Sequence, residues 1–298
     1  MTDGDAGAPL AGERLFILGA GRAGRGLARA LRLRGASVHL HGRRDESGPD
    51  AVRGGPVPRA LGGAGLALLA VQDAAVAAAL AEVVAARPAP GTVVLSASGS
   101  ADDERLDPAR NAGLPAGTFH PLLPLSSPAR APALLRGSYV GVAGDAAAVA
   151  AAERLAAALG AHTLRIPPGS RARYHAAAVF ASNFPTVLAA LAERLLAASG
   201  VGAEARDATL SLMVAAVTNL REQPPAAALT GPVARGDGET VRRHLAALEN
   251  DRGAREVYVA LSRAALQLVG GAGRDDVAAA LAPPAITADS SSPPDRTP

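Results

Sequence analysis

The residues best suited to acid–base chemistry lie in residues 174–185, which read YHAAAVFASNFP. His175 and Ser182 share one face of a helix because they are about two turns apart, and Asn183 lies beside that face. A histidine titrates near neutral pH and can donate a proton. Pro185 lacks an N–H and is expected to bend the helix. We expect His175, Ser182 and Asn183 to be catalytic; alternatively, His175 bonds another helix while Ser182 and Asn183 satisfy the bend.

His120 is a second candidate, in residues 118–122 (TFHPL), at the end of a predicted strand. The carboxyl ends of parallel strands line the ligand crevice of an α/β sheet, so His120 could bind a substrate there. The alternative is a histidine that merely closes the edge of the sheet. The other four histidines lie in no such setting, and the six together show no metal-binding spacing, so no metal site is expected.

A third segment, residues 229–237 (LTGPVARGD), combines a predicted loop with polar residues. Arg235 could hold a substrate carboxylate through two parallel hydrogen bonds. Asp237 can cap a helix that begins near Gly238. We expect Thr230, Arg235 and Asp237 to bind substrate; the alternative is an Arg235–Asp237 pair that only stiffens the loop.

Near the N-terminus, a short apolar run at 15–18 is followed at once by GAGRAG at 19–24 and then by an amphipathic helix. This strand–turn–helix order is the context that the dinucleotide-binding fingerprint requires. Gly19 allows the tight turn, Gly21 lets the backbone approach a pyrophosphate, and Gly24 lets the helix pack closely. The helix N–H groups and dipole attract the phosphates. The alternative is a glycine-rich turn that binds nothing. The predicted cofactor site comprises Gly19, Ala20, Gly21, Arg22, Ala23, Gly24, Val71, Gln72 and Ser98, at the ends of three predicted strands.

Two arginines indicate which cofactor that turn would bind. An NAD site places an acidic residue about twenty positions after the glycines to hold the ribose 2′-hydroxyl. Here Arg43 and Arg44 end the second predicted strand, nineteen residues after Gly24. Guanidinium groups suit a 2′-phosphate, so the cofactor is predicted to be NADP. The alternative is a pair of solvated loop arginines.

Composition narrows the class of protein. The 298 residues are 49% apolar, which is enough for a large core and suggests two domains. A net charge of +3, spread evenly, does not favour nucleic acid as a partner. There is no cysteine and no lysine, so thiolate and Schiff-base chemistry are excluded. No signal peptide and no membrane-spanning stretch of about 18 residues is expected, and a cytoplasmic location is the simplest.

The fold class is predicted to be α/β, a doubly wound Rossmann domain followed by an all-α domain of the 6-phosphogluconate dehydrogenase C-terminal type. Asp73 is expected to cap the helix at 74–86, and four long helices are expected after Pro167-Pro168. The predicted domains are a disordered N-terminus at 1–13, the Rossmann domain at 14–168, the helical domain at 169–281 and a disordered tail at 282–298. Predicted strands lie at 15–18, 37–42, 66–71, 92–97, 117–120, 138–143 and 163–166, and the long helices at 170–199, 203–221, 240–250 and 254–270.

The sequence resembles the family of NADP-binding Rossmann-like proteins with a C-terminal helical domain of unknown function 2520. The matching segments are GAGRAG at 19–24, AVQDAAV at 70–76, SASGS at 96–100, TFHPLLPLS at 118–126, YHAAAVFASN at 174–183 and LTGPVARGD at 229–237. The resemblance implies kinship with pyrroline-5-carboxylate reductase, ketopantoate reductase and 6-phosphogluconate dehydrogenase. Such enzymes hold a nicotinamide between two domains, and their helical domains commonly dimerise. Hydroxyacid dehydrogenases and ordinary ketopantoate reductases use a catalytic lysine on the first long helix of the second domain, for which His175 is the nearest substitute in this chain.

These patterns together predict an NADPH-dependent reductase of a small keto acid or imino acid, with ketopantoate and then pyrroline-5-carboxylate as the first substrates to test. The alternative is a non-catalytic NADP-binding protein that reports cofactor state to a partner. The helix at 170–199 is apolar on more than one face, so it must be covered on most sides. A homodimer through the helical domain is therefore expected, with no nucleic-acid or membrane partner.

Overall fold

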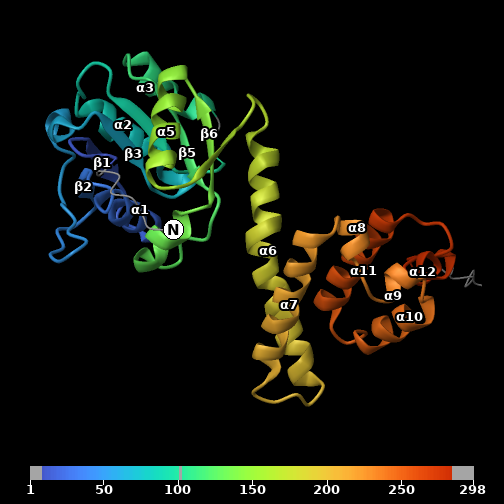
Figure 1. Ribbon diagram of the computed structural model, residues 1–298. Coiled ribbons are helices and arrows are strands. Elements are labelled where there is room, and N and C mark those ends of the chain that lie inside the picture. Colours follow the sequence, from blue (N-terminus) through green and yellow to red (C-terminus); the bar gives the residue numbers. More distant parts are fainter. Residues whose placement is uncertain (1–8, 101–102, 284–298) are drawn as a thin grey trace, which may run out of the picture. The chain divides into compact units, whose positions relative to one another are not determined.

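The computed structural model describes residues 9–100 and 103–283, and the chain divides into two compact units after Pro185 (Figure 1). The first unit contains a sheet and the helices that cover it. The second contains helices only, among the described residues. Sheet elements give way to helices after Pro167-Pro168, where the sequence predicted the domain boundary, but the first half of the next helix belongs to the compact sheet unit.

The sheet has the order β2-β1-β3-β4-β5-β6-β7, and each predicted strand is present. Five neighbouring pairs are parallel, whereas β6 runs antiparallel to β5. The sequence did not predict this reversal. It arises because the connection at 122–138 holds only short helices, and antiparallel neighbours need no long crossover. The strands are β1 Arg14–Leu18, β2 Ser37–His41, β3 Leu66–Leu69, β4 Val93–Ser96, β5 Ala116–Pro121, β6 Tyr139–Gly144 and β7 His162–Arg165.

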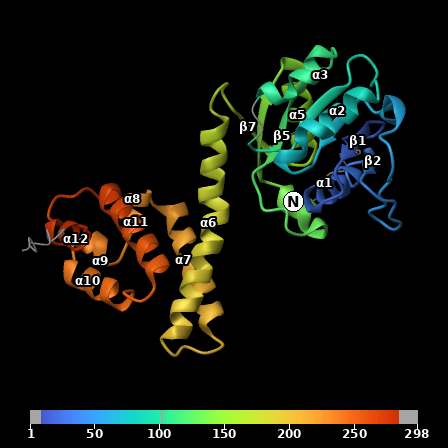
Figure 2. The same cartoon turned by 180° about the vertical axis from the view of Figure 1, so that it is seen from behind.

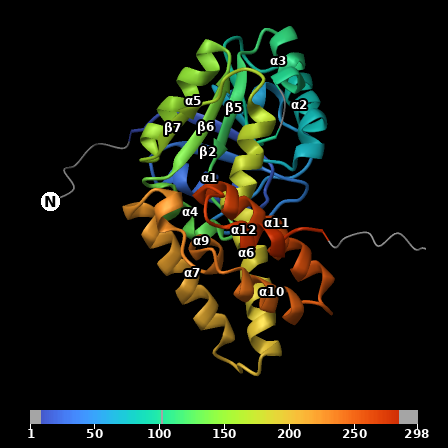
Figure 3. The ribbon, with the colours of Figure 1, turned by 90° about the vertical axis from the view of Figure 1, so that its right-hand side faces the viewer.

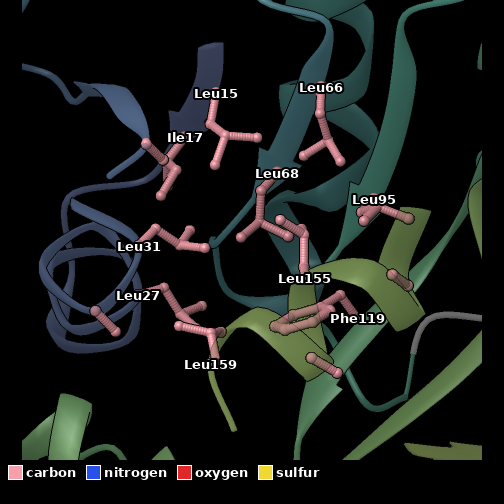
Figure 4. Close-up of a cluster of buried hydrophobic side chains, with 14 of the residues drawn as sticks. Leu15, Ile17, Leu27, Leu31, Leu66, Leu68, Leu95, Phe119, Leu155 and Leu159 are labelled. Atoms are coloured by element: carbon pink, nitrogen blue, oxygen red, sulfur yellow. The ribbon is translucent and has the colours of Figure 1, made fainter. Parts of the chain in front are cut away.

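Helices cover both faces of the sheet because its strands are apolar on both sides. Leu15 and Ile17 of β1 face α1 and α5, where Leu27 and Leu155 complete one core cluster (Figure 4). The intervening Phe16 faces the other layer, which contains α2 and α3 (Figure 3). These helices are α1 Arg22–Arg32, α2 Val76–Ala85, α3 Asp107–Asn111, α4 Ala131–Leu135 and α5 Ala146–Ala158, with short 3-10 helices η1 Arg59–Gly63, η2 Asp73–Ala75, η3 Asp103–Leu106 and η4 Pro128–Arg130.

The predicted disordered N-terminus is partly ordered. Residues 9–13 form a turn in which Leu10 is buried in the core and its N–H donates to the carbonyl of Arg34 at 3.0 Å. The remainder of that predicted segment, residues 1–8, and residues 284–298 of the predicted tail lie outside the described residues.

The helical unit has a small core of its own. Val233, Val241, Leu245 and Val277 bury their side chains together, with Tyr258 packed against them. The helices that carry these residues form the orange and red part of the ribbon (Figure 2). All four predicted long helices are present, and three short ones were not predicted. The helices are α6 Arg171–Ala198, α7 Ala205–Glu222, α8 Pro225–Ala228, α9 Pro232–Arg235, α10 Gly238–Ala247, α11 Arg252–Val269 and α12 Asp275–Ala280.

Helix α6 corrects one expectation from the sequence. By length and apolar composition alone, it is the one helix within residues 9–100 and 103–283 that could cross a membrane. The sequence analysis expected no such stretch, because Arg and Glu recur in the alanine-rich runs. The difference arises because residues 174–192 carry no charged side chain. Length and composition do not separate a membrane span from a helix that protein covers.

Candidate active site

The turn after β1 has the geometry that a dinucleotide fingerprint needs. Gly19 has a φ of +118°, which disfavours any other residue, and a Cβ there would overlap the carbonyl of Ala70. A Cβ on Gly24 would overlap the carbonyl of Gly19, so glycine permits this close packing of helix and strand. Around Gly21, by contrast, a Cβ would meet nothing within 4 Å. The turn is therefore closed toward the sheet and open where a pyrophosphate would lie.

The first turn of α1 has no side-chain cap. Arg22, its first residue, is exposed, and Ala20 and Ala23 are half-buried. Arg25 stabilises the turn, because its Nε donates to the carbonyl of Ala20 at 2.8 Å and its Nη2 pairs with Glu46 at 2.6 Å. The sequence analysis did not identify Arg25, because its charged partner Glu46 lies outside the fingerprint, in the loop after β2.

Arg43 and Arg44 are exposed directly after β2. The neighbouring acids are engaged elsewhere: Asp45 accepts from the N–H of Gly54 at 3.1 Å, and Glu46 pairs with Arg25. Within residues 9–100 and 103–283, neither Arg43 nor Arg44 forms an ion pair. Both guanidinium groups are thus available to an anion at the end of β2.

Asp73 does not cap a helix as predicted. The 3-10 turn at its position has no side-chain cap, and the Asp73 carboxylate instead accepts hydrogen bonds from Ser98 Oγ at 2.7 Å and from Ser100 Oγ. Burial raises the pKa of Asp73, but the Ser100 and Ser98 hydrogen bonds, with the charges of His175 and Arg105, hold that pKa below its usual value. Asp73 therefore fixes the loop after β4. The predicted cofactor residues Val71, half-buried, and Gln72, exposed, precede it, and Ser98 is buried.

His120 and Tyr174 form a hydrogen-bonded pair. The Tyr174 hydroxyl lies 2.8 Å from His120 Nδ1, and the rings meet edge to face with centroids 5.6 Å apart. A Cβ on Gly141, which is paired with His120 in the sheet, would overlap that hydroxyl. The sequence analysis did not select Tyr174, which lies about 100° around the helix from His175. It reaches the site because His120 approaches α6 from a different strand.

The imidazole rings of His120 and His175 approach each other beside Gly99. The ring centroids of His120 and His175 are 5.8 Å apart. A Cβ on Gly99 would lie 2.6 Å from His175 Nδ1 and 2.7 Å from His120 Nε2, so the absence of a side chain lets both rings approach one point. His175 Nδ1 is buried and has no hydrogen-bond partner in the described part of the chain. A buried nitrogen without a partner is costly and is suited to a polar atom of a ligand.

Burial keeps His120 and Tyr174 uncharged. Burial lowers the pKa of His120 to about 4, assisted by the charges of His175 and Arg171 and opposed by Asp73. Burial also raises the pKa of Tyr174 to about 12, against the charge of Arg171. At neutral pH, His120 is therefore a neutral imidazole and Tyr174 a neutral phenol.

Arg171 anchors the first turn of α6 to the sheet. Its side chain is buried, and Nη2 donates to Thr118 Oγ1 of β5 at 3.2 Å. This bond holds Tyr174 and His175 beside β5. The sequence analysis could not identify Arg171, because no local pattern distinguishes it from the other arginines among the thirty basic residues.

The other predicted site residues lie farther along the chain. Ser182 is half-buried and Asn183 exposed, on later turns of α6. Thr230 and Arg235 are exposed in the helical unit, and Arg235 ends a single helical turn where a loop was expected. Asp237 caps α10 as predicted, accepting from the N–H and hydroxyl of Thr240 at 3.0 and 2.7 Å. The parts of these residues in catalysis and substrate binding stay predictions.

Comparison with known proteins supports the resemblance inferred from the motifs. Residues 138–265 match the model of the family described as a domain of unknown function, DUF2520, which confirms that resemblance. No curated protein sequence matches the chain.

Solved structures share the fold across both units. BF3122 from Bacteroides fragilis, considered an NADP oxidoreductase, is 22% identical with a TM-score of 0.71, and the match covers 88% of this chain and all of that one. Pyrroline carboxylate reductase from Plasmodium falciparum, solved with NADP bound, is 11% identical with a TM-score of 0.61, covering 90% and 98% of the two chains. An imine reductase from Myxococcus stipitatus in complex with NADP+ is 18% identical with a TM-score of 0.60, also covering 90% and 98%. The predicted fold class, a Rossmann domain followed by a helical region, is therefore confirmed.

Proposed function

We propose that the protein is an NADPH-dependent reductase of a small keto acid or imino acid. The observation that carries the proposal is the cluster of His120, Tyr174 and His175 over Gly99. It lies at the carboxyl ends of β4 and β5, which are two and three strands along the sheet from β1, the strand that precedes the turn at 19–24. Ligands of open α/β sheets bind along this edge.

The residues present fit an NADP-type cofactor. The open space at Gly21 and the uncapped start of α1 suit a pyrophosphate, and the exposed Arg43 and Arg44 suit a 2′-phosphate. Pyrroline carboxylate reductase and imine reductase, which share the fold, were solved with NADP and NADP+ respectively. When bound, NADPH would supply a hydride.

The protein's own part in such a reduction is to hold and protonate the substrate. His175 Nδ1 is a buried nitrogen with no hydrogen-bond partner in the described part of the chain, and we assign it the transfer of a proton to the reduced group. Ser182 and Asn183 would orient the substrate, and Arg235, with Thr230 and Asp237, would bind its carboxylate. A non-catalytic NADP-binding protein is the second candidate, and the lack of lysine is the observation that favours it.

A screen of keto and imino acids, followed by NADPH oxidation, tests the proposal. His175→Ala should lower turnover by ~10²–10⁴, the usual loss for a positioned general acid, and leave NADPH affinity within a few fold. His175→Gln should bind substrate yet remain slow. His162→Ala, at an exposed position of the same unit, is the matched control and should be unaffected. If NADPH binds but no candidate acid oxidises it, the result would favour the non-catalytic alternative.

The same proposal includes a homodimer through the helical unit. Large apolar side chains on α7 are exposed, among them Leu212 at 74% and Val214 at 66%. Residues 208–220 of that helix carry no charge. An exposed apolar stretch of this kind is typical of an interface, and a second copy of the chain presents the same stretch.

A further inference from the structure

We infer that Tyr174 is a positioning residue that fixes His120 with its proton on Nε2, so that His120 and His175 together receive a carbonyl oxygen rather than an imine nitrogen. This inference rests on the proposed function and narrows it to keto substrates. It assigns Tyr174 a role that the sequence analysis did not give it.

The first step concerns the direction of the hydrogen bond between Tyr174 and His120. A neutral imidazole has one N–H and one lone pair, and a neutral phenol has one O–H. His120 Nδ1 lies 2.8 Å from the Tyr174 oxygen, so one of the two must donate to the other. The phenol is the stronger acid and the imidazole lone pair the stronger acceptor, so Tyr174 donates. His120 then carries its single hydrogen on Nε2.

The second step concerns what keeps this pair in place. The Tyr174 hydroxyl lies against the backbone of Gly141, where a Cβ would overlap it. Gly141 is the register partner of His120 across β5 and β6. Arg171, one helical turn before Tyr174, is bonded to Thr118 of β5. The hydroxyl is therefore held opposite His120 by the sheet itself, and burial keeps both groups neutral at pH 7.

The third step concerns where the two imidazoles point. His120 Nε2 and His175 Nδ1 lie 2.7 and 2.6 Å from the position that a Cβ on Gly99 would occupy. No protein atom can occupy that position without moving a ring. A small substrate atom beside it would face His120 Nε2–H and the His175 nitrogen that has no partner in the described chain. As the proton donor assigned under the proposed function, His175 Nδ1 would carry a hydrogen, so two donors would share one acceptor.

The fourth step concerns which acceptor can satisfy two donors. A carbonyl oxygen has two lone pairs and gains negative charge as hydride adds to its carbon, which is the charge that preorganised donors stabilise. In the proposed reduction, bound NADPH would supply the hydride to the carbonyl carbon and the C=O π pair would form the new O–H bond. The proton would come from Nδ1 of His175 in its imidazolium form, which is left as a neutral ring. An imine nitrogen has a single lone pair, and a protonated iminium has none. The geometry thus favours a ketone.

Histidine NMR on the full-length, cofactor-free protein tests the position of the proton. Nitrogen-15 shifts separate the two tautomers, and His120→Gln assigns the His120 signals among the six histidines. We expect an Nε2–H tautomer for His120 at neutral pH, and its loss or mixing in Tyr174→Phe. Tyr258→Phe is the matched control, because Tyr258 forms a similar 2.9 Å pair with His244 in the other unit. An Nδ1–H tautomer in the unmodified protein overturns the inference even if Tyr174→Phe fails to fold.

Kinetics test the substrate class. We expect a keto acid to be reduced at least tenfold faster, by kcat/KM, than a cyclic imino acid such as pyrroline-5-carboxylate, and Tyr174→Phe to slow the keto acid by roughly ten- to a hundredfold, below the usual loss for a full oxyanion donor. Faster reduction of the imine overturns the inference. Failure to reduce any acid would refute the proposed function and with it the ketone preference, whereas the tautomer is decided separately by NMR.

Discussion

Replacing Gly99 by alanine would place a methyl group at the point where the two imidazoles converge. The new Cβ would lie 2.6 Å from His175 Nδ1 and from His120 Cε1, whereas ordinary contact begins at 3.4 Å. Each ring must therefore retreat by about 0.8 Å, the difference between these two values. A misplacement of about 1 Å can cost ~10² in rate, and overpacking costs about 1–3 kcal/mol of stability. We expect turnover to fall about a hundredfold while the protein still folds.

The assay combines steady-state reduction, thermal unfolding and NADPH titration of the same Gly99→Ala protein. NADPH affinity should stay within a few fold, because the turn at 19–24 is not altered. Gly65→Ala is the matched control, since it is exposed in the same unit and its Cβ would meet nothing within 4 Å. Near-normal turnover of Gly99→Ala with unchanged stability would refute the reasoning that both rings must pack against this glycine.

Three further predictions concern cofactor choice, pH and assembly. The protein should bind NADPH more tightly than NADH, and an Arg43→Asp, Arg44→Ala double variant should lose most of that preference; equal affinities in the unmodified protein, measured by titration of both cofactors, would contradict this. Because the pKa of His120 falls from 6.5 to about 4 on folding, the unfolded chain binds the extra proton, and stability should drop by about 2 kcal/mol between pH 7 and pH 5. Urea unfolding of His120→Gln should show that much less pH dependence, and an equal dependence would count against the buried neutral imidazole. Light scattering should show a dimer at micromolar concentration, and Leu212→Glu should disrupt it. Leu33→Glu should not, because Leu33 is similarly exposed but lies in the sheet unit. A monomeric unmodified protein would rule the dimer out.

Short sequence patterns predicted the parts of the site that depend on residues close together in the chain. The tight turn at Gly19 and the close packing of helix and strand at Gly24 follow from the strand–turn–helix order, and the structure has both. Asp237 caps α10 as expected, because its partner Thr240 is three residues away. The strands were located by their apolar runs, although these runs carry no information on the antiparallel direction of β6.

Contacts between distant segments account for what the sequence could not predict. His120 and His175 were each selected, but their convergence depends on Gly99, at the end of a third element. Tyr174 was not selected, because its partner His120 lies on a strand 54 residues earlier in the chain. Aspartate commonly caps helices, but the Asp73 carboxylate accepts hydrogen bonds from two serine hydroxyls in the loop after the next strand.

Arg25 has a consequence for any attempt to convert the cofactor preference. It links the carbonyl of Ala20, in the turn at 19–24, to Glu46, in the loop that carries the two exposed arginines. Grafting an NAD-type loop over residues 43–46 would remove Glu46 and release Arg25 from its partner. The two ends of the cofactor site are therefore not independent modules, and substitutions in them should combine non-additively. Redesign of the ribose end would have to supply a new acid for Arg25.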